Sequence, residues 1–253
     1  MSGGRLGTAQ TVREDEVPRG VSGPVVALDA LGTASVAWTH APGPVVRIAA
    51  RTRGPHGSWL APRDVGATPS SNPQMVITSE RTNIVAWHAA GSDSEGEGLR
   101  SGALDVRSRT SDGRLGTTQR VSEVRTRTYR LAAAPSGETL LAYAAVEPPD
   151  VGLHIATRPP GGQFAAPGPF DAIRPESFNG GAAYLGDGTA LYAWGSDGNV
   201  RLVSRAPGAS FGATPEVDTP GLYPLIAATG TRAVVAYAVA AGSRVRLLAL
   251  ARR

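Results

Sequence analysis

"GTASVAW" at residues 32–38 is a short apolar run that ends on an aromatic residue, and the pattern returns along the whole chain. The further copies are RTNIVAW (81–87), GETLLAY (137–143), GTALYAW (188–194) and TRAVVAY (231–237). The aromatics that end these runs are Trp38, Trp87, Tyr143, Trp194 and Tyr237. Motifs that recur at intervals of roughly fifty residues indicate an internal structural repeat.

Each copy is flanked by further apolar runs. Upstream, at a constant distance from the aromatic, stand PVVALD, PQMVIT, YRLAAA, GGAAYL and YPLIAA. Downstream comes a third run, VRIAAR, LDVRSR, LHIATR, VRLVSR or VRLLAL, which finishes on arginine in the first four copies, at Arg51, Arg109, Arg158 and Arg205. A fourth element reads GSWLAPRDV, GRLGTTQRV, GQFAAPGPF or ASFGATPEV. Short, often alternating runs bounded by Gly, Pro, Asn and Asp are typical of β-strands, and no stretch keeps a helical period.

Four strands in each repeat predict an all-β fold, a five-bladed β-propeller built from four-stranded blades. The fourth element is missing after the fifth repeat, yet GRLGTAQTV at residues 4–12 nearly copies GRLGTTQRV at 113–121. We therefore expect residues 4–12 to pair with the C-terminal strands and complete the last blade, which leaves no sheet edge exposed. On this interpretation residues 1–253 form a single domain. A β-solenoid gives no reason to permute one strand, and a sandwich would not repeat so evenly.

Composition excludes several classes of function. The chain has no cysteine and no lysine, so disulfides, thiolate nucleophiles, cysteine metal sites and Schiff-base chemistry are ruled out. Four histidines show no metal-ligand spacing, and no cofactor is expected. A formal charge of +4 without a basic-aromatic strip argues against nucleic acid. No apolar run approaches the roughly 18 residues of a membrane span.

The N-terminus MSGGRLG lacks the basic-then-apolar pattern of a signal peptide. If such a peptide has been removed, the expected location is extracellular or periplasmic, and we expect a monomer.

The loops that lead into the first strands and those that join the second strands to the third share one face of a propeller. Known propellers usually bind their ligands on this loop-rich face, and the resemblance to them makes it the expected binding site for a glycan or a small polar ligand. The candidate ligand-binding residues are Trp38, His40, Gln74, Trp87, His88, Arg130, Tyr143, Trp194 and Tyr237. For the aromatics, core packing between blades is the favoured interpretation, and stacking on a sugar face is the alternative. The two histidines are more typical of solvated loop residues than of ligand contacts.

Arg130 breaks the repeat. At the constant distance before the recurrent aromatic, it corresponds to Val25, Gln74, Gly181 and Pro224. These positions are expected at the top of the first strand of each blade, which lines the central channel of a propeller. An arginine among apolar and small equivalents needs a carboxylate partner or an anionic ligand. Glu147, Asp171 and Glu176 lie in adjoining loops, and an internal ion pair with one of them is favoured over a ligand site.

The blade phrases resemble known propellers. G-x-[WF]-x-[AG]-P followed by G-T-A-x-V-A-W is similar to the degenerate repeats of secreted bacterial propellers in the sialidase-like (BNR) group. The blade number and the repeat length resemble those of tachylectin-type lectins. The likeness covers nearly the whole chain and implies the propeller fold. The Asp-box of sialidases is not met, since the corresponding turns read RGPHGSW, RPPGGQF and RAPGASF.

Three functions remain open at this point. The favoured one is a non-catalytic, lectin-like carbohydrate-binding or interaction module, in which several similar sites would add avidity. The alternative is a glycoside hydrolase with its site at the channel mouth. It would need a carboxylate pair, for which Glu147, Asp171, Glu176 and Asp197 are the candidates. A purely protein-binding propeller is the third.

Overall fold

The computed structural model describes residues 22–41, 45–66, 70–89, 102–171, 180–212, 215, 217–241 and 244–252. Its regular elements are all β-strands. They are β1 (Ser22–Leu28), β2 (Ala34–His40), β3 (Arg47–Arg53), β4 (Arg63–Asp64), β5 (Ser70–Ile77), β6 (Asn83–Ala89), β7 (Gly102–Arg109), β8 (Gln119–Ala133), β9 (Thr139–Ala145), β10 (Gly152–Arg158), β11 (Gly168–Asp171), β12 (Gly180–Tyr184), β13 (Ala190–Ser196), β14 (Asn199–Arg205), β15 (Val217–Pro220), β16 (Leu222–Thr229), β17 (Arg232–Ala241) and β18 (Arg244–Arg252).

The strands form antiparallel sheets in simple sequence order. The orders are β1-β2-β3-β4, β5 to β11 in one seven-stranded sheet, β12-β13-β14-β15, and β16-β17-β18. The seven-stranded sheet arises because β8 is continuous: it pairs with β7 as far as Thr126 and with β9 from Thr126 onward. The first half of β8 is thus the outer strand of the second repeat, and its second half is the inner strand of the third repeat. The four-strand repeat predicted from the sequence is present in this order.

Aspartate side chains stabilise the turns between the first and second strands of two repeats. Asp29 follows β1, and its Oδ1 accepts hydrogen bonds from the amide N–H groups of Leu31 (2.9 Å) and Thr33 (2.7 Å). Asp187 caps the corresponding turn before β13 by accepting from the Thr189 amide at 2.8 Å. An aspartate that bonds to the backbone two or more residues on stabilises a tight turn, which is the role that its side chain suits best.

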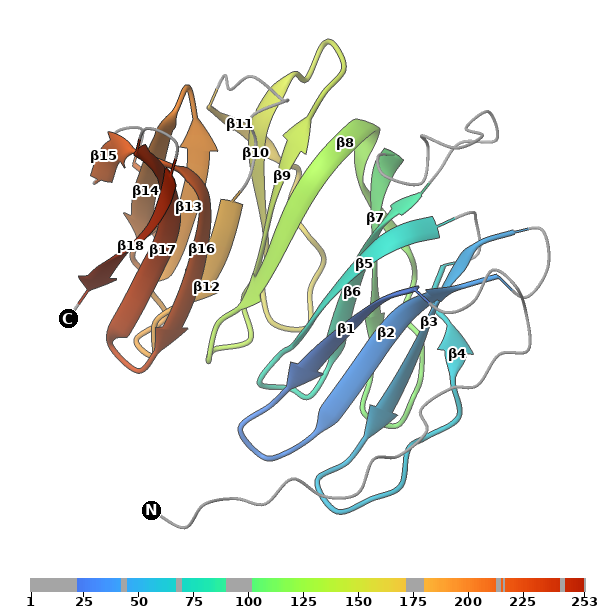
Figure 1. The fold of residues 1–253 in the computed structure, drawn as a ribbon. Coiled ribbons are helices and arrows are strands. Elements are labelled where there is room, and N and C mark those ends of the chain that lie inside the picture. Colours follow the sequence, from blue (N-terminus) through green and yellow to red (C-terminus); the bar gives the residue numbers. More distant parts are fainter. Residues whose placement is uncertain are drawn as a thin grey trace.

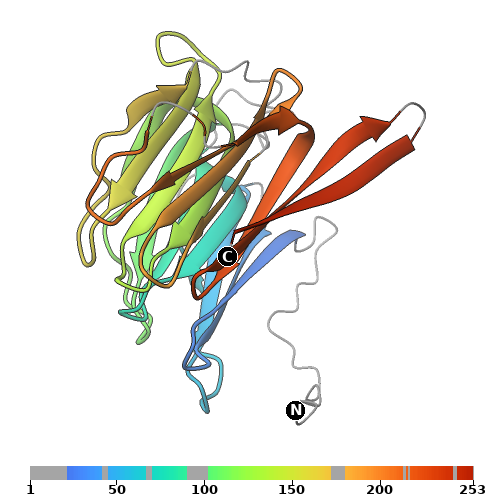
Figure 2. The ribbon, with the colours of Figure 1, turned by 90° about the vertical axis from the view of Figure 1, so that its left-hand side faces the viewer.

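The sheets stand side by side around a common axis (Figures 1 and 2). Their inner strands contact each other in the order β1, β5, β8, β12, β16. Apolar side chains fill the space between neighbouring sheets; one such core joins Leu153 to Tyr192 and Trp194, and another joins Val200 to Val235. In the described part of the chain the series is open between β16 and β1 (Figure 1).

Two of the arginines at the ends of the third strands connect neighbouring sheets. Pairing with the second strands makes Arg53, Arg109, Arg158, Arg205 and Arg252 equivalent. Arg205 forms a largely buried ion pair with Glu138 of the preceding sheet, and Arg109 donates to the Thr52 hydroxyl. The equivalent in the first repeat is therefore Arg53 and not the predicted Arg51, and the fifth repeat also has this arginine, at Arg252.

The register corrects a second prediction. Leu225 pairs with Ala236 as Val25 pairs with Ala37, so Leu225, and not Pro224, is the fifth equivalent of Arg130. The cause is the turn between β16 and β17. It follows Thr229, which pairs with Arg232, and it is one residue shorter than the corresponding turns of the other repeats. The predicted closing strand at residues 4–12 lies outside the described residues.

Candidate functional site

A cavity of about 530 Å³ lies between the beginnings of β1 and β5 and the second half of β8. It is lined by residues 23–26 of β1, 72–75 of β5 and 127–130 of β8, together with His88 at the end of β6. These are the positions that the repeat alignment placed at the channel mouth. The structure therefore brings together three of the predicted ligand-binding residues: Gln74, His88 and Arg130.

A β-bulge shapes each inner strand at this level. The register shifts between Ser22 and Val25, between Ser71 and Gln74, and between Thr126 and Tyr129. Within two of these bulges the backbone is left-handed, at Gly23 (φ 57°) and Asn72 (φ 50°). Glycine and asparagine tolerate that conformation better than other residues. Bulges redirect side chains, and here they carry the residues that line the cavity.

The same bulge in β16 contains a residue that the sequence reasoning missed. Tyr223 occupies the position of Gly23 and Asn72, has φ of 56° and is 61% exposed. A left-handed backbone is costly for a bulky side chain, and such strain tends to cluster at functional sites. The signal in the sequence was the aromatic in GLYP at residues 221–224, which breaks the small-residue pattern of the other repeats.

Backbone carbonyl groups hold Arg130 in place. Its Nε donates to the carbonyl oxygen of Gly180 at 2.6 Å, and its Nη1 donates to that of Tyr129 at 2.8 Å. Glu147, a predicted partner, instead pairs with Arg125 at 3.2 Å. Within the described residues no carboxylate pairs with Arg130, so the expected internal ion pair is not found there.

Gln74 connects two inner strands. Its Nε2 donates to the Tyr129 carbonyl oxygen at 2.5 Å, and its Oε1 accepts from the Leu131 amide at 3.2 Å. The side-chain amide of Gln74 thus uses both its nitrogen and its oxygen in bonds to β8. Its main role is to fix the shape of the cavity wall.

His88 lies beneath the cavity with 1% of its surface exposed. Its ring meets that of Tyr129 edge-on at 5.0 Å, and neither ring nitrogen has a hydrogen-bond partner in the described part of the chain. Burial lowers the pKa of His88 to about 4, so the ring is neutral near pH 7. Burying an unpaired polar group is unfavourable, which makes this imidazole an available donor and acceptor.

The predicted histidine at position 40 has a different environment. Its Nε2 lies 2.8 Å from Oδ1 of Asp64, and Asp64 also accepts from Arg47 at 3.1 Å. The sequence favoured solvated surface positions for both histidines, and the structure shows both rings buried. The cause is that the second strands extend to residues 40 and 89, so each histidine belongs to a strand and not to a loop.

The recurrent aromatics are buried within the sheets. Trp38, Trp87, Tyr143, Trp194 and Tyr237 are each at most 6% exposed. Tyr143 stacks on His154 with ring centroids 5.2 Å apart, and burial raises its pKa to about 12. This position between neighbouring sheets gives the rings a packing role, and they do not line the cavity at the channel mouth.

The predicted carboxylates are not gathered at the cavity. Glu147 is bound to Arg125, and Asp197 is an exposed turn residue with φ of 51° that accepts from the Ser196 hydroxyl at 3.1 Å. Asp171 pairs through its backbone with Leu153, and Glu176 lies outside the described residues. Among the described residues no aspartate or glutamate lines this cavity.

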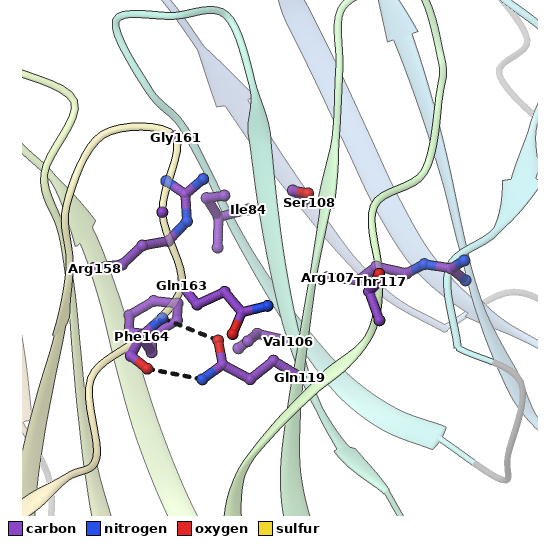
Figure 3. A pocket seen from close by; sticks show the side chains of 11 residues that line it. Ile84, Val106, Arg107, Ser108, Thr117, Gln119, Arg158, Gly161, Gln163 and Phe164 are labelled. Atoms are coloured by element: carbon purple, nitrogen blue, oxygen red, sulfur yellow. Dashed lines mark hydrogen bonds between the residues drawn. The ribbon is translucent and has the colours of Figure 1, made fainter.

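A second cavity, of about 190 Å³, lies between sheet strands at the opposite end of β6 and β7 (Figure 3). There the Gln119 amide bonds to both backbone groups of Phe164, accepting from its N–H at 2.9 Å and donating to its carbonyl oxygen at 2.8 Å. Figure 3 shows Arg158 beside these two residues. We interpret this site as a structural link between neighbouring groups of strands.

No cluster of three or more histidines and acidic residues suited to a metal ion occurs among the described residues. No helix in that part of the chain has the length and apolarity that a membrane crossing requires.

Comparisons with known proteins identify the fold. No protein-family model matches the chain, and no curated protein matches its sequence. Among solved structures, an ulvan lyase, a polysaccharide lyase, is similar with a TM-score of 0.58 and 12% identity over 91% of this chain and 70% of the lyase. A lectin from Aleuria aurantia, described as a six-bladed β-propeller with a fucose recognition mode, is similar at 0.50 with 12% identity, covering 90% and 74% of the two chains.

An α-L-arabinanase from Penicillium chrysogenum in complex with arabinobiose is also similar, with a TM-score of 0.51 and 12% identity over 90% of this chain and 76% of the enzyme. These likenesses show that the chain has a β-propeller fold. They include both a lectin and enzymes that act on carbohydrates, so the fold alone favours neither function.

Proposed function

We propose that this protein is a non-catalytic carbohydrate-binding module and that its ligand occupies the cavity between β1, β5 and β8. The observation that carries the proposal is the cavity wall. Neither ring nitrogen of His88 has a hydrogen-bond partner among the described residues. Arg130 bonds only to backbone carbonyl groups there, and both residues lie next to the apolar side chains of Val25 and Met75. Convergent polar groups in a partly apolar hollow are the usual character of a small-ligand site.

An exposed aromatic supports a saccharide as the ligand. Tyr223 lies outside the cavity lining, in the β16 bulge that is equivalent to the Asn72 bulge of β5, and keeps 61% of its surface exposed. Aromatic faces stack on the apolar faces of sugars, and a strained backbone holds this ring outward. Tyr223 therefore suits the sugar-stacking role, which was the alternative interpretation for the recurrent aromatics.

The hydrolase alternative requires two carboxylates at a fixed separation. The described lining of the cavity provides none, and Glu147 is engaged by Arg125. Among its described residues, the lining of this cavity therefore gives no support to catalysis.

We further propose that the propeller has five blades and that residues 4–12 close the ring on β18. Sequence identity with residues 113–121 supports this pairing, because that segment leads into β8 and pairs with β7. β18 is an edge strand among the described residues, and Leu247 on it is 82% exposed. A long apolar edge strand is normally covered.

A blocked cavity tests the binding site. Val26 lines the cavity from β1, and Val26→Trp would fill it, whereas Ala30→Trp places the same ring in the exposed turn at the far end of β1. On an immobilised glycan panel we expect the wild type and Ala30→Trp to bind the same saccharides and Val26→Trp to lose them. Equal binding by both variants would place the ligand elsewhere, and binding to proteins but to no glycan would favour the protein-binding function.

A further inference from the structure

Among the described residues, the lining of the cavity at the channel mouth carries positive charge and no carboxylate. Arg127 and Arg130 both line it, and its described lining contains no aspartate or glutamate. Arg127 is exposed and has no ion pair or hydrogen bond within the described residues. Two like charges in one hollow repel each other, and an anionic ligand relieves that repulsion.

The guanidinium of Arg130 is oriented but not neutralised. Carbonyl oxygens of Gly180 and Tyr129 accept from its Nε and Nη1, at 2.6 and 2.8 Å. These neutral acceptors fix the plane of the group and leave other N–H donors unused, since an arginine has five. A guanidinium held in one orientation suits the planar, two-point recognition of a carboxylate or a sulfate.

Other arginines of β8, in contrast, have carboxylate partners. Arg125, two residues before Arg127 on β8, pairs with Glu147 at 3.2 Å, and Arg120 on the same strand pairs with Asp105. The described acids near the start of β8 are thus engaged by arginines outside the cavity. His88 adds a neutral ring, whose nitrogens have no partner in the described part of the chain, beneath the two cations.

We infer that this cavity selects saccharides that carry an anionic group, a carboxylate or a sulfate ester, and that Arg130 and Arg127 bind that group. The inference rests on the proposed carbohydrate-binding function and deepens it. His88 hydrogen-bonds a hydroxyl of the same sugar, and the apolar wall formed by Val25 and Met75 contacts its ring face.

Calorimetric titration of the full chain with three ligands tests this inference. The ligands are a galacturonate trisaccharide, the matching neutral galactose trisaccharide and a sulfated galactose trisaccharide, each measured at low salt and at about 0.15 M salt. We expect both anionic ligands to bind at least tenfold more tightly than the neutral one and to weaken as salt rises. The tighter of the two anionic ligands identifies the group that is recognised.

Matched variants locate the effect. Arg127→Gln and Arg130→Gln should each weaken the preferred anionic ligand about tenfold, and Arg125→Gln, the same change two residues away, should leave it within twofold. Melting curves show whether each variant is folded; Arg127 is exposed, so its variant tests the inference even if Arg130→Gln unfolds.

The outcomes separate the two proposals. Equal affinity for neutral and anionic trisaccharides, or equal losses in Arg125→Gln and Arg127→Gln, would overturn the inference and leave the carbohydrate-binding function standing. Binding to no saccharide, in this titration and on a broad glycan panel, would overturn both.

Discussion

Arg130 on β8 donates to the backbone carbonyl of Gly180 on β12 at 2.6 Å, so one side chain joins the inner strands of two successive sheets. Gln74 makes the same kind of connection from β5 to β8. The inner strands are thus linked at the level of the cavity by side chains that bond to neighbouring backbone groups. This arrangement holds the cavity open and leaves the charge of Arg130 available.

Substitutions of Arg130 and Arg205 should lower the free energy of unfolding by different amounts. Arg130→Gln removes bonds to neutral carbonyl groups, for which we expect a loss of about 1–2 kcal/mol in the free energy of unfolding. Arg205→Gln removes the cation that pairs with Glu138 in a largely buried site and leaves that carboxylate only the Tyr184 hydroxyl, so we expect a loss of about 3 kcal/mol or more. Urea denaturation of both variants measures the difference. An equal or larger loss for Arg130→Gln would indicate a carboxylate partner for Arg130.

The recurrent aromatics should behave as core residues. Trp87 is 1% exposed, and Trp87→Ala should destabilise the protein by roughly 3–5 kcal/mol. Trp59, a partly exposed residue that contacts the Arg53 guanidinium, provides the matched control, and Trp59→Ala should cost less than half as much. Full stability of Trp87→Ala combined with loss of glycan binding would return this ring to the list of ligand contacts.

Stability should fall in mildly acidic solution because of His88. Its folded-state pKa of about 4 lies below the value of 6.5 for an unperturbed histidine, since burial disfavours the charged ring. Between those values the unfolded chain binds a proton that the folded chain does not. The contribution of the neutral ring is therefore fully present above about pH 6.5 and is lost as the pH falls toward 4.

At roughly 1.4 kcal/mol per pKa unit, the loss amounts to about 3 kcal/mol. Tyr129 contacts the ring edge-on, and Gln74, Arg127 and Arg130 line the same cavity. Denaturation at several pH values should show a shallower acid slope for His88→Gln than for the wild type. His56→Gln, which changes an exposed histidine, should keep the wild-type slope, and a parallel profile for His88→Gln would contradict the buried, unpaired ring.

The closing strand should matter more than its terminal position suggests. Deleting residues 1–12 should expose β18 and cost several kcal/mol or cause aggregation, because an uncovered edge strand pairs with other chains. Deletion of residues 1–3 alone is the control and should change neither property. A monomer that lacks residues 1–12 and melts at the parent temperature would refute ring closure.

Much of the fold could be predicted from local sequence. Alternation, turn residues and the recurrent aromatics located nearly every strand, because these signals depend on neighbours within one hairpin. The errors concern register. A shorter β16–β17 turn shifted the equivalence from Pro224 to Leu225, and strand pairing moved the repeated arginine from Arg51 to Arg53. A fixed offset along the chain cannot detect a one-residue change in a turn.

The site was predicted less completely. Gln74, His88 and Arg130 were named, but their environments depend on strands that are distant in sequence. The carbonyl group that holds Arg130 is fifty residues away along the chain. Tyr223 was missed because its prominence comes from a left-handed backbone at a bulge, and a bulge is a property of strand pairing.

A crystal structure of the protein soaked with the saccharide that binds best on the glycan panel tests the central claim most directly. We predict sugar density in the cavity between β1, β5 and β8, with a ring hydroxyl within hydrogen-bond distance of His88 and the guanidinium of Arg130 facing the ligand. Density at another face of the propeller, with this cavity holding only water, would contradict the account.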